Sequence, residues 1–265
     1  MKKKLKSNLF IGVLSGTSAD SIDAGLFKID KKISFLNFAS TKYDEKLKDA
    51  ILDISRNKKL PSKGVLKDID NKVGEISAKT INKLIKKTPF KASEICAIGS
   101  HGQTLMHKRQ GRKTFSLQVG DPFLIGRETN ITTVSNFRQA NIKNGGQGAP
   151  LTPIFHQLLA SKHLIKLPVC FLNIGGISNI TIVFDKNDPT KLFSRDIGPG
   201  NCLIDSWVRA NSNKKYDSNG LLALSGTKNE IIFEQAQELY MNRNNKKKMS
   251  FDTNDFDISF VRGLN

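Results

Sequence analysis

The chain has 265 residues, of which 38% are hydrophobic and 25% charged, a composition that supports a buried core and excludes a disordered chain or a coiled coil. No apolar run is long enough to cross a bilayer, and the one near the N-terminus is shorter than the core of a signal peptide, so we expect a cytoplasmic protein with no membrane partner. Cys96, Cys170 and Cys202 are an odd number of cysteines without a CxxC pair, which excludes a disulfide framework and a zinc site of the usual kind.

The net charge of +18 at pH 7 raises the question of nucleic-acid binding, because a basic surface releases counterions from phosphates. The positive residues are mainly lysines spread along the chain, and their clusters lack the interleaved aromatic residues of a single-strand binding groove. We therefore expect no nucleic-acid partner.

Apolar patterning predicts strands and helices in an order that occurs twice. In the first half, the predicted strands cover residues 9–15, 23–29, 33–38, 95–98, 115–119 and 131–134. Two helices with apolar positions at helical spacing are predicted between the third and fourth of these strands, around residues 47–54 and 65–85. After a glycine-rich turn at residues 145–148, the second half repeats the pattern with strands over residues 169–174, 180–184 and 192–194 and a helix over about 201–209.

This repetition predicts two related α/β domains rather than one doubly wound sheet. We place the first domain at residues 1–142 and the second at residues 143–265. The second is expected to be incomplete, because its last residues read as a strand or turn with no helix to close it.

The segment between the first two predicted strands is rich in small and hydroxyl residues, whose amides and side chains can converge on phosphate oxygens. The candidate phosphate ligands are Gly16, Thr17, Ser18, Ala19, Asp20, Ser21, Ile22 and Asp23. The alternative is an ordinary polar β-turn.

The second half has a similar loop at Gly175 and Gly176, again between two predicted strands. Two such loops, one from each domain, would clamp a triphosphate together with Mg²⁺. The alternative is a pair of unrelated hairpins.

Asp196 lies at the end of a predicted strand and precedes a turn and a helix, so its carboxylate is a candidate general base. Gly198 and Gly200 allow close backbone approach, and Asn201 can cap the helix. The alternative is a capping aspartate.

Two polar stretches around His101 and Gln103 and around Gln147 carry amides and an imidazole, which suit the recognition of sugar hydroxyls. The alternative is that both stretches are connecting turns. His107, His156 and His163 are expected to be surface or packed histidines.

Seven motifs, in this order along the chain, resemble those of the anhydro-N-acetylmuramic acid kinase family. They are SGTSADSID at 15–23, GSHGQT at 99–104, QVGDP at 118–122, NFR at 136–138, GGQGAPLTPIFH at 145–156, NIGGISN at 173–179 and DIGPGN at 196–201.

The resemblance implies a fold with two RNase H-like domains of the actin, hsp70 and hexokinase superfamily around an interdomain cleft. It also implies an enzyme that uses ATP and Mg²⁺ to convert 1,6-anhydro-N-acetylmuramic acid and water into N-acetylmuramic acid 6-phosphate during recycling of cell-wall sugar. Asp196 would then activate the water, while the ATP phosphates would lie at residues 16–23 and at the glycine turns that contain Gly175 and Gly198. The sugar would contact His101, Gln103, Arg138 and Gln147, with Arg138 on its lactyl carboxylate.

The chain also departs from the family pattern. Ser21 stands where the family has Gly, and Asn136, Gln139 and Asn141 stand where it has two carboxylates and a guanidinium. Family chains continue past the equivalent of Asn265, so the chain is expected to be truncated, and a non-catalytic remnant that binds sugar or a partner is the alternative function. We expect the apolar residues Phe256, Ile258, Phe260 and Val261 to be uncovered and to cause self-association or poor solubility, with a homodimer as the candidate form of self-association.

Overall fold

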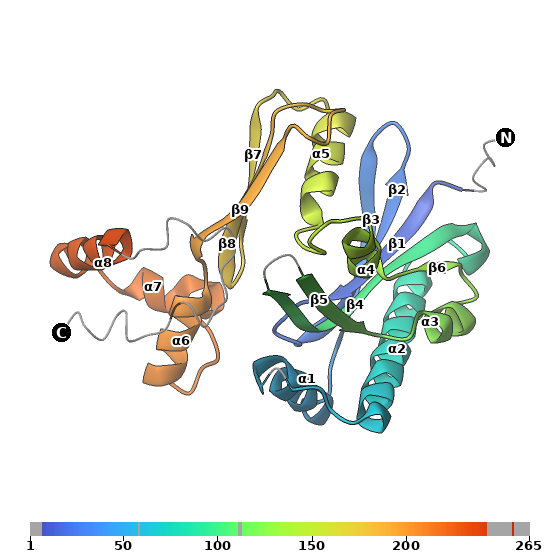
Figure 1. The fold of residues 1–265 in the computed structure, drawn as a ribbon, viewed down its shortest axis with the longest axis horizontal. Coiled ribbons are helices and arrows are strands. Elements are labelled where there is room, and N and C mark those ends of the chain that lie inside the picture. The colour runs from blue at the N-terminus through green and yellow to red at the C-terminus, as the bar shows by residue number, and fades with distance from the viewer. Residues whose placement is uncertain (1–6, 58, 111–112, 243–255, 257–265) are drawn as a thin grey trace. The chain divides into compact units, whose positions relative to one another are not determined.

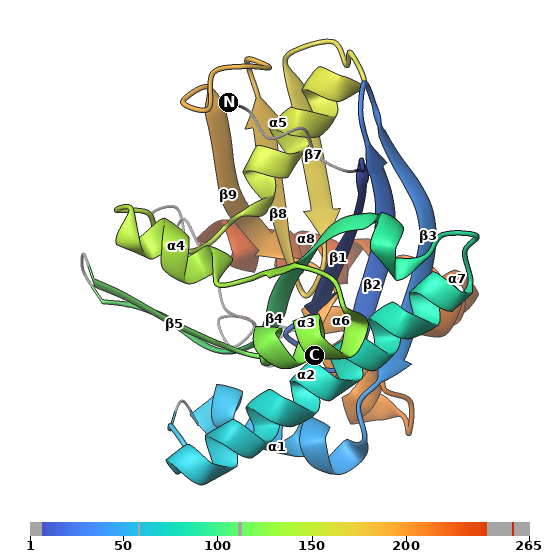
Figure 2. The ribbon, with the colours of Figure 1, turned by 90° about the vertical axis from the view of Figure 1, so that its right-hand side faces the viewer.

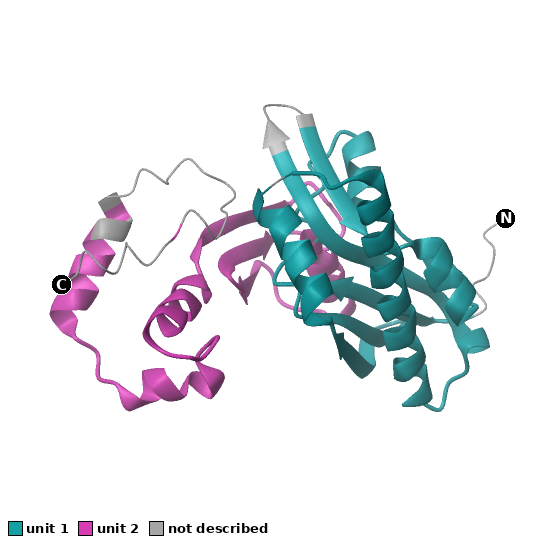
Figure 3. Ribbon diagram, turned by 90° about the horizontal axis from the view of Figure 1, so that it is seen from below, with its two compact units in different colours: residues 1–151 teal, residues 152–265 magenta. Residues whose placement is uncertain are grey.

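The computed structural model describes residues 7–57, 59–110, 113–242 and 256 (Figure 1). The chain divides into two compact units, Met1–Leu151 and Thr152–Asn265 (Figure 3). The domain boundary expected after residue 142 lies inside a helix of unit 1, α4 (Phe137–Lys143). Hydrogen bonds between residues 145–148 and α4 hold the following loop in that unit as well. That the units are RNase H-like domains, the second incomplete, stays a prediction.

The described residues of unit 1 form one mixed sheet in which the strand order is β3-β2-β1-β4-β5, with β6 paired to β4. β1 is antiparallel to β2 and parallel to β4. The strands are β1 (Leu9–Ser15), β2 (Ser21–Ile29), β3 (Ile33–Lys42), β4 (Ile95–Gln110), β5 (Lys113–Val119) and β6 (Thr133–Val134).

All of these strands were predicted, but β4 is much longer than residues 95–98. The stretch from Gly99 to Thr104 belongs to this strand, so the alternative that it is a connecting turn is wrong. Gly102 has a φ of 70° at a register shift between β1 and β4, and a single glycine at such a bulge lets a strand continue through polar residues that read as a turn.

Helices α1 (Glu45–Asn57), α2 (Lys63–Lys86) and α3 (Pro122–Thr129) complete the core of unit 1, with a 3₁₀ turn at Ala92–Glu94 before β4. α2 packs against β2, β3 and α3 (Figure 2). Its apolar positions recur every three or four residues and are buried against the sheet residues Ile22 and Leu26, as the helical spacing predicts.

Unit 2 contains an antiparallel sheet in the order β7-β8-β9 among its described residues. The strands are β7 (Val169–Ile174), β8 (Ile177–Val183) and β9 (Leu192–Pro199). Helix α5 (Thr152–Lys162) packs on β8 and β9. Its buried Gln157 donates hydrogen bonds to the carbonyls of Asp185 at 2.9 Å and Asp188 at 2.8 Å, which fixes the β8–β9 hairpin.

Helix α6 (Cys202–Asn211) confirms the helix predicted after β9, whereas α7 (Leu221–Ser225), the 3₁₀ turn Ser218–Gly220 and α8 (Glu230–Asn242) were not predicted.

Phe256 is 5% exposed, so the expectation that it lies uncovered is wrong. Ile258, Phe260 and Val261 lie outside the described residues. None of the helices in the described part of the chain is long and apolar enough to cross a membrane.

Candidate functional site

The β1–β2 loop (residues 16–20) is a tight turn whose first and last carbonyl groups, those of Gly16 and Asp20, accept hydrogen bonds from the rest of unit 1. The amide of Ala19 donates to the carbonyl of Gly16 at 3.1 Å, and Ala19 has a φ of 49° and is fully buried. Thr17 and Ser18 are exposed, and among the described residues their amides have no backbone acceptor. These amides and hydroxyls are groups that can bind an anion, and the phosphate-binding role expected for the loop stays a prediction.

Two carboxylates flank this loop. Asp20 is 64% exposed and forms an ion pair with Lys48 on α1. Asp23 accepts hydrogen bonds from the hydroxyls of Ser21 at 3.0 Å and Ser40 at 2.6 Å. Ile22, between them, is 1% exposed and belongs to the core, so its side chain is a packing residue.

His101 and Arg138 lie side by side in unit 1. Arg138 Nε donates to His101 Nε2 at 2.9 Å, so the proton of the neutral ring is on Nδ1, which lies 3.0 Å from the carbonyl of Gly102 and donates to it. Burial lowers the pKa of His101, and the charge of Arg138 adds to that effect. The imidazole is therefore held neutral, in one tautomer, against the guanidinium.

Arg138 itself is half-buried, and burial lowers its pKa. Among the described residues its only hydrogen-bond partner is His101. A guanidinium with five donors, of which one is used, and with no ion pair to a carboxylate in the described ranges is suited to an anionic ligand.

Gln103 is fully buried and its amide is used inside the protein. Its Nε2 donates to the carbonyls of Gly16 at 3.2 Å and Thr104 at 3.1 Å, and its Oε1 accepts from the hydroxyl of Tyr43 at 3.4 Å. The structure therefore connects Gln103 to the β1–β2 loop.

The loop that carries Gln147 is closed by Asn141, one of the residues that departs from the family pattern. The amide of Gly148 donates to Asn141 Oδ1 at 2.7 Å, and the amide of Gly146 donates to the Asn141 carbonyl at 2.9 Å. Gln147 is exposed at the tip of this loop. Asn136, another departure, has a φ of 61° before α4, a conformation that asparagine tolerates better than most residues.

In unit 2 the two predicted glycine turns contact each other directly. The amides of Gly200 and Cys202 donate to the Gly176 carbonyl at 2.9 and 3.2 Å, and the amide of Asn201 donates to the Gly175 carbonyl at 2.7 Å. A Cβ at Gly200 would overlap the Gly175 carbonyl oxygen, so this position needs glycine.

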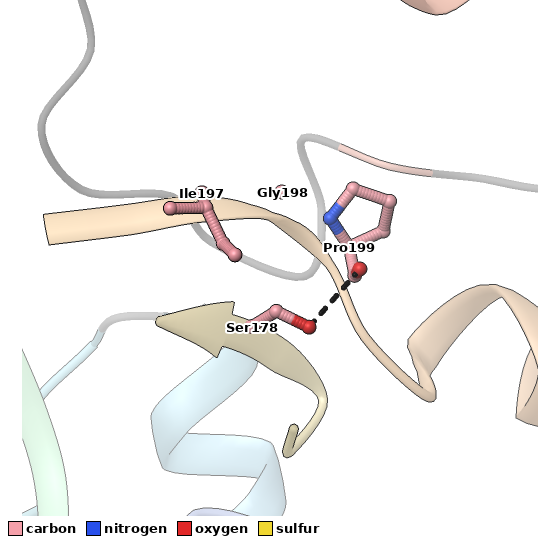
Figure 4. Close-up of a pocket in the computed structure, with 4 residues that line it drawn as sticks. All are labelled: Ser178, Ile197, Gly198 and Pro199. Carbon is pink, nitrogen blue, oxygen red and sulfur yellow. Dashed lines mark hydrogen bonds between the residues drawn. The ribbon is translucent and has the colours of Figure 1, made fainter. Parts of the chain in front are cut away.

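These hydrogen bonds divide the predicted ATP ligands of unit 2 into two groups. The amides of Gly200 and Asn201 are used within the protein, whereas those of Gly175 and Gly176 have no backbone acceptor among the described residues. Beside the turns, Ser178 from β8 and Ile197, Gly198 and Pro199 from β9 line an open pocket (Figure 4). Ser178 Oγ donates to the Pro199 carbonyl at 3.3 Å.

Asp196 is half-buried on β9, directly opposite Asn179 on β8, which in turn is opposite Asn173 on β7. Directly opposite residues of antiparallel strands share one face of the sheet. The Asp196 carboxylate and the side-chain amides of Asn179 and Asn173 therefore lie in a row across the same face. The register shifts immediately after Asp196, at Ile197, and such a bulge re-aims the neighbouring side chains.

Sequence reasoning did not single out Tyr43 or Lys48 as site residues, and it named Asn173 and Asn179 only as members of the loop motif at 173–179. For Tyr43 and Lys48 the sequence carries no signal, because their contacts depend on the packing of β3 and α1. Asn173 and Asn179 each lie three residues from Gly176, and they pair because the β7–β8 hairpin is centred on that residue.

The candidate ligands for Mg²⁺ beside the loop are the hard carboxylate oxygens that this ion prefers, those of Asp20, which is paired with Lys48, and of Asp23, which accepts from Ser21 and Ser40. No group of three or more histidine, cysteine, aspartate or glutamate residues in the described ranges could hold a metal ion by itself. The residues present fit a metal that is bound mainly through the phosphates of a ligand rather than in a protein cage.

The described residues form a mixed α/β fold in which the amides of two turns have no backbone acceptor among the described residues and a half-buried guanidinium contacts a histidine. The chain belongs to the anhydro-N-acetylmuramic acid kinase family, whose model it matches over residues 8–260.

Relatives and solved structures give the extent of this similarity. The chain is 40% identical to an anhydro-N-acetylmuramic acid kinase of Pelagibacter ubique, an alignment that covers 96% of this chain and 68% of that protein. It is 39% identical to that of Photobacterium profundum, with 85% of this chain and 59% of the relative covered. The chain thus spans roughly three fifths to two thirds of the length of these relatives. A PPX-GPPA enzyme of Aquifex aeolicus covers 88% of the chain, and the chain covers 63% of it, at a TM-score of 0.32 and 10% identity, a likeness on which no argument rests.

Proposed function

We propose that the protein is an ATP-dependent sugar kinase that converts 1,6-anhydro-N-acetylmuramic acid and water into N-acetylmuramic acid 6-phosphate. The observation that carries this proposal is the family match over residues 8–260. The geometry of each unit supports it with groups suited to the phosphates, the sugar and the attacking water.

The nucleotide phosphates would bind the amides that have no partner within the described protein. In unit 1 these are the amides of Thr17 and Ser18, and in unit 2 those of Gly175 and Gly176. Gly198, Gly200 and Asn201 would shape the second turn rather than donate to ATP. Mg²⁺ on the phosphates supplies charge neutralisation, and Asp20 and Asp23 are the residues that would hold it.

The sugar would bind unit 1 through Arg138. Its guanidinium faces no carboxylate among the described residues and has donors to spare, which suits the lactyl carboxylate that distinguishes muramic acid from glucosamine. His101 would fix the orientation of the guanidinium, and the exposed Gln147 would reach sugar hydroxyls.

Asp196 would act as the general base. It would take a proton from the water that attacks the anomeric carbon, and the bond between that carbon and the 6-oxygen would break. The 6-oxygen would then take the γ-phosphoryl group of ATP, and ADP would leave. The half-buried position of Asp196 beside a bulge supports this role.

We place this reaction in the cytoplasm, where ATP is available, as a step in peptidoglycan recycling. The absence of nucleic-acid and membrane partners and the formation of a homodimer stay predictions.

The test is the release of ADP by the full-length protein with MgATP and 1,6-anhydro-N-acetylmuramic acid, with the sugar product identified by mass spectrometry. The proposal expects turnover that requires both substrates and a product that carries both water and phosphate. Binding of sugar and nucleotide without turnover would instead favour a non-catalytic binding protein.

A further inference from the structure

Gln103 stands out in unit 1 because a large polar side chain is fully buried in the sheet. A buried amide is tolerated only where its donors and acceptor are satisfied. Gln103 meets this requirement within the protein. Its Nε2 donates to the carbonyls of Gly16 and Thr104, and its Oε1 accepts from the hydroxyl of Tyr43.

The bond to Gly16 has a particular consequence for the β1–β2 loop. The Gly16 carbonyl accepts twice, from the amide of Ala19 at 3.1 Å and from Gln103 at 3.2 Å. Both lone pairs of this oxygen are therefore used, and the start of the turn is fixed to β4.

Tyr43 completes the arrangement at the other end of the loop. Its amide donates to the Asp20 carbonyl at 3.3 Å, while its hydroxyl donates to Gln103 Oε1. Burial raises the pKa of Tyr43 to about 12, so the hydroxyl stays a donor across the physiological range. Gln103 and Tyr43 thus hold both ends of the loop through carbonyl oxygens.

We infer that Gln103 is a positioning residue for the β1–β2 loop and does not contact the sugar. Gln103 and Tyr43 donate hydrogen bonds to the carbonyls of Gly16 and Asp20 and so fix the conformation of the turn. In this conformation the amides of Thr17 and Ser18 have no backbone acceptor among the described residues and can bind the anion. This inference rests on the proposed function only in taking that anion to be the phosphate chain of ATP.

The test compares Gln103→Met with Gln118→Met, a matched control on β5 whose Nε2 donates to Ser116 and Thr104 but not to the loop. Hydrogen exchange of the Ala19 amide, the buried loop amide that donates to the Gly16 carbonyl, is measured first, because it does not depend on activity. Loss of the hydrogen bond to Gly16 is expected to raise this exchange about tenfold in Gln103→Met and to leave it unchanged in the control.

Calorimetry then separates the two roles that Gln103 can have. A positioning role predicts that Gln103→Met binds MgATP about tenfold more weakly and 1,6-anhydro-N-acetylmuramic acid as the wild type does. Loss of sugar affinity with unchanged loop exchange would overturn the inference. Wild-type protein that binds no MgATP would contradict the proposed function, while the exchange measurement would still decide the role of Gln103.

If Gln103→Met does not fold, Tyr43→Phe carries the test. Removal of the hydroxyl leaves Gln103 Oε1 without its donor, so exchange of the Ala19 amide is expected to rise at least about threefold. An unchanged exchange rate in the folded Tyr43→Phe protein would overturn the inference.

Discussion

Arg138 and His101 are joined by a hydrogen bond of 2.9 Å between Nε and Nε2. The acceptor is available only while the imidazole is neutral, because a protonated ring has no lone pair to offer. The orientation of the Arg138 guanidinium on α4 is therefore linked to the protonation state of His101 on β4.

Arg138→Gln should weaken binding of 1,6-anhydro-N-acetylmuramic acid about tenfold to a hundredfold, because a charged hydrogen bond contributes about 1.5–3 kcal/mol. MgATP affinity should stay unchanged. Calorimetry with each ligand measures both effects. Arg127→Gln is the control, since Arg127 is 73% exposed and its ion pair is with Glu128. Equal sugar affinity in the Arg138 variant and in the wild type would contradict the assignment.

Unit 1 should lose stability as the pH falls below the ordinary histidine pKa of ~6.5. Burial lowers the pKa of His101 in the folded protein, so the unfolded chain binds more protons between its own pKa and the folded one, and acid favours unfolding there. Above ~6.5 both states are neutral at this residue and the effect vanishes.

Urea unfolding at pH about 7.5 and about 5.5, on either side of that pKa, measures this loss. His101→Gln should reduce the difference between the two free energies of unfolding. A residual difference is expected, because burial also lowers the pKa values of His107 and His156. A variant with the full pH dependence of the wild type would show that His101 does not contribute.

Gly200→Ala should destabilise unit 2 by about 1–3 kcal/mol, because the added methyl group would overlap the Gly175 carbonyl oxygen and force the two glycine turns apart. Gly175→Ala is the matched control, since its Cβ would have ordinary contacts of 3.6 Å. Denaturant unfolding of both variants checks this. Equal stability of the two would mean that the turns can separate at little cost.

The periodic parts of the fold could be predicted from the sequence, and the exceptions have physical reasons. β1 matches its predicted range because its apolar residues are continuous. β4 was cut short because Gly99 and Gly102 read as turn residues, although one glycine with positive φ serves a bulge within the strand. Helix α8 was missed, since its apolar residues Ile231 and Phe233 are exposed rather than part of a buried stripe.

The candidate site could be predicted by residue type but not by role. The motif positions included His101 and Arg138, which the structure brings together. Gln103 was assigned to the sugar because glutamine is a good ligand for hydroxyls, whereas in the structure its amide is buried between Gly16 and Tyr43. Spacing along the chain cannot reveal this, because the burial of Gln103 depends on how Tyr43 and the β1–β2 loop pack against β4.

The central claim is that Asp196 activates water in a phosphoryl-transfer reaction. The most direct test is the rate of ADP release by the full-length Asp196→Asn protein with saturating MgATP and 1,6-anhydro-N-acetylmuramic acid. Asp185→Asn serves as the control, because it replaces another aspartate of unit 2 whose oxygen accepts hydrogen bonds from backbone amides, a role an asparagine can keep. The account predicts a loss of about 10²–10⁴ in kcat for Asp196→Asn, with sugar and nucleotide affinities close to those of the wild type. A near wild-type rate for Asp196→Asn, or a loss of sugar binding in parallel with the rate, would contradict it.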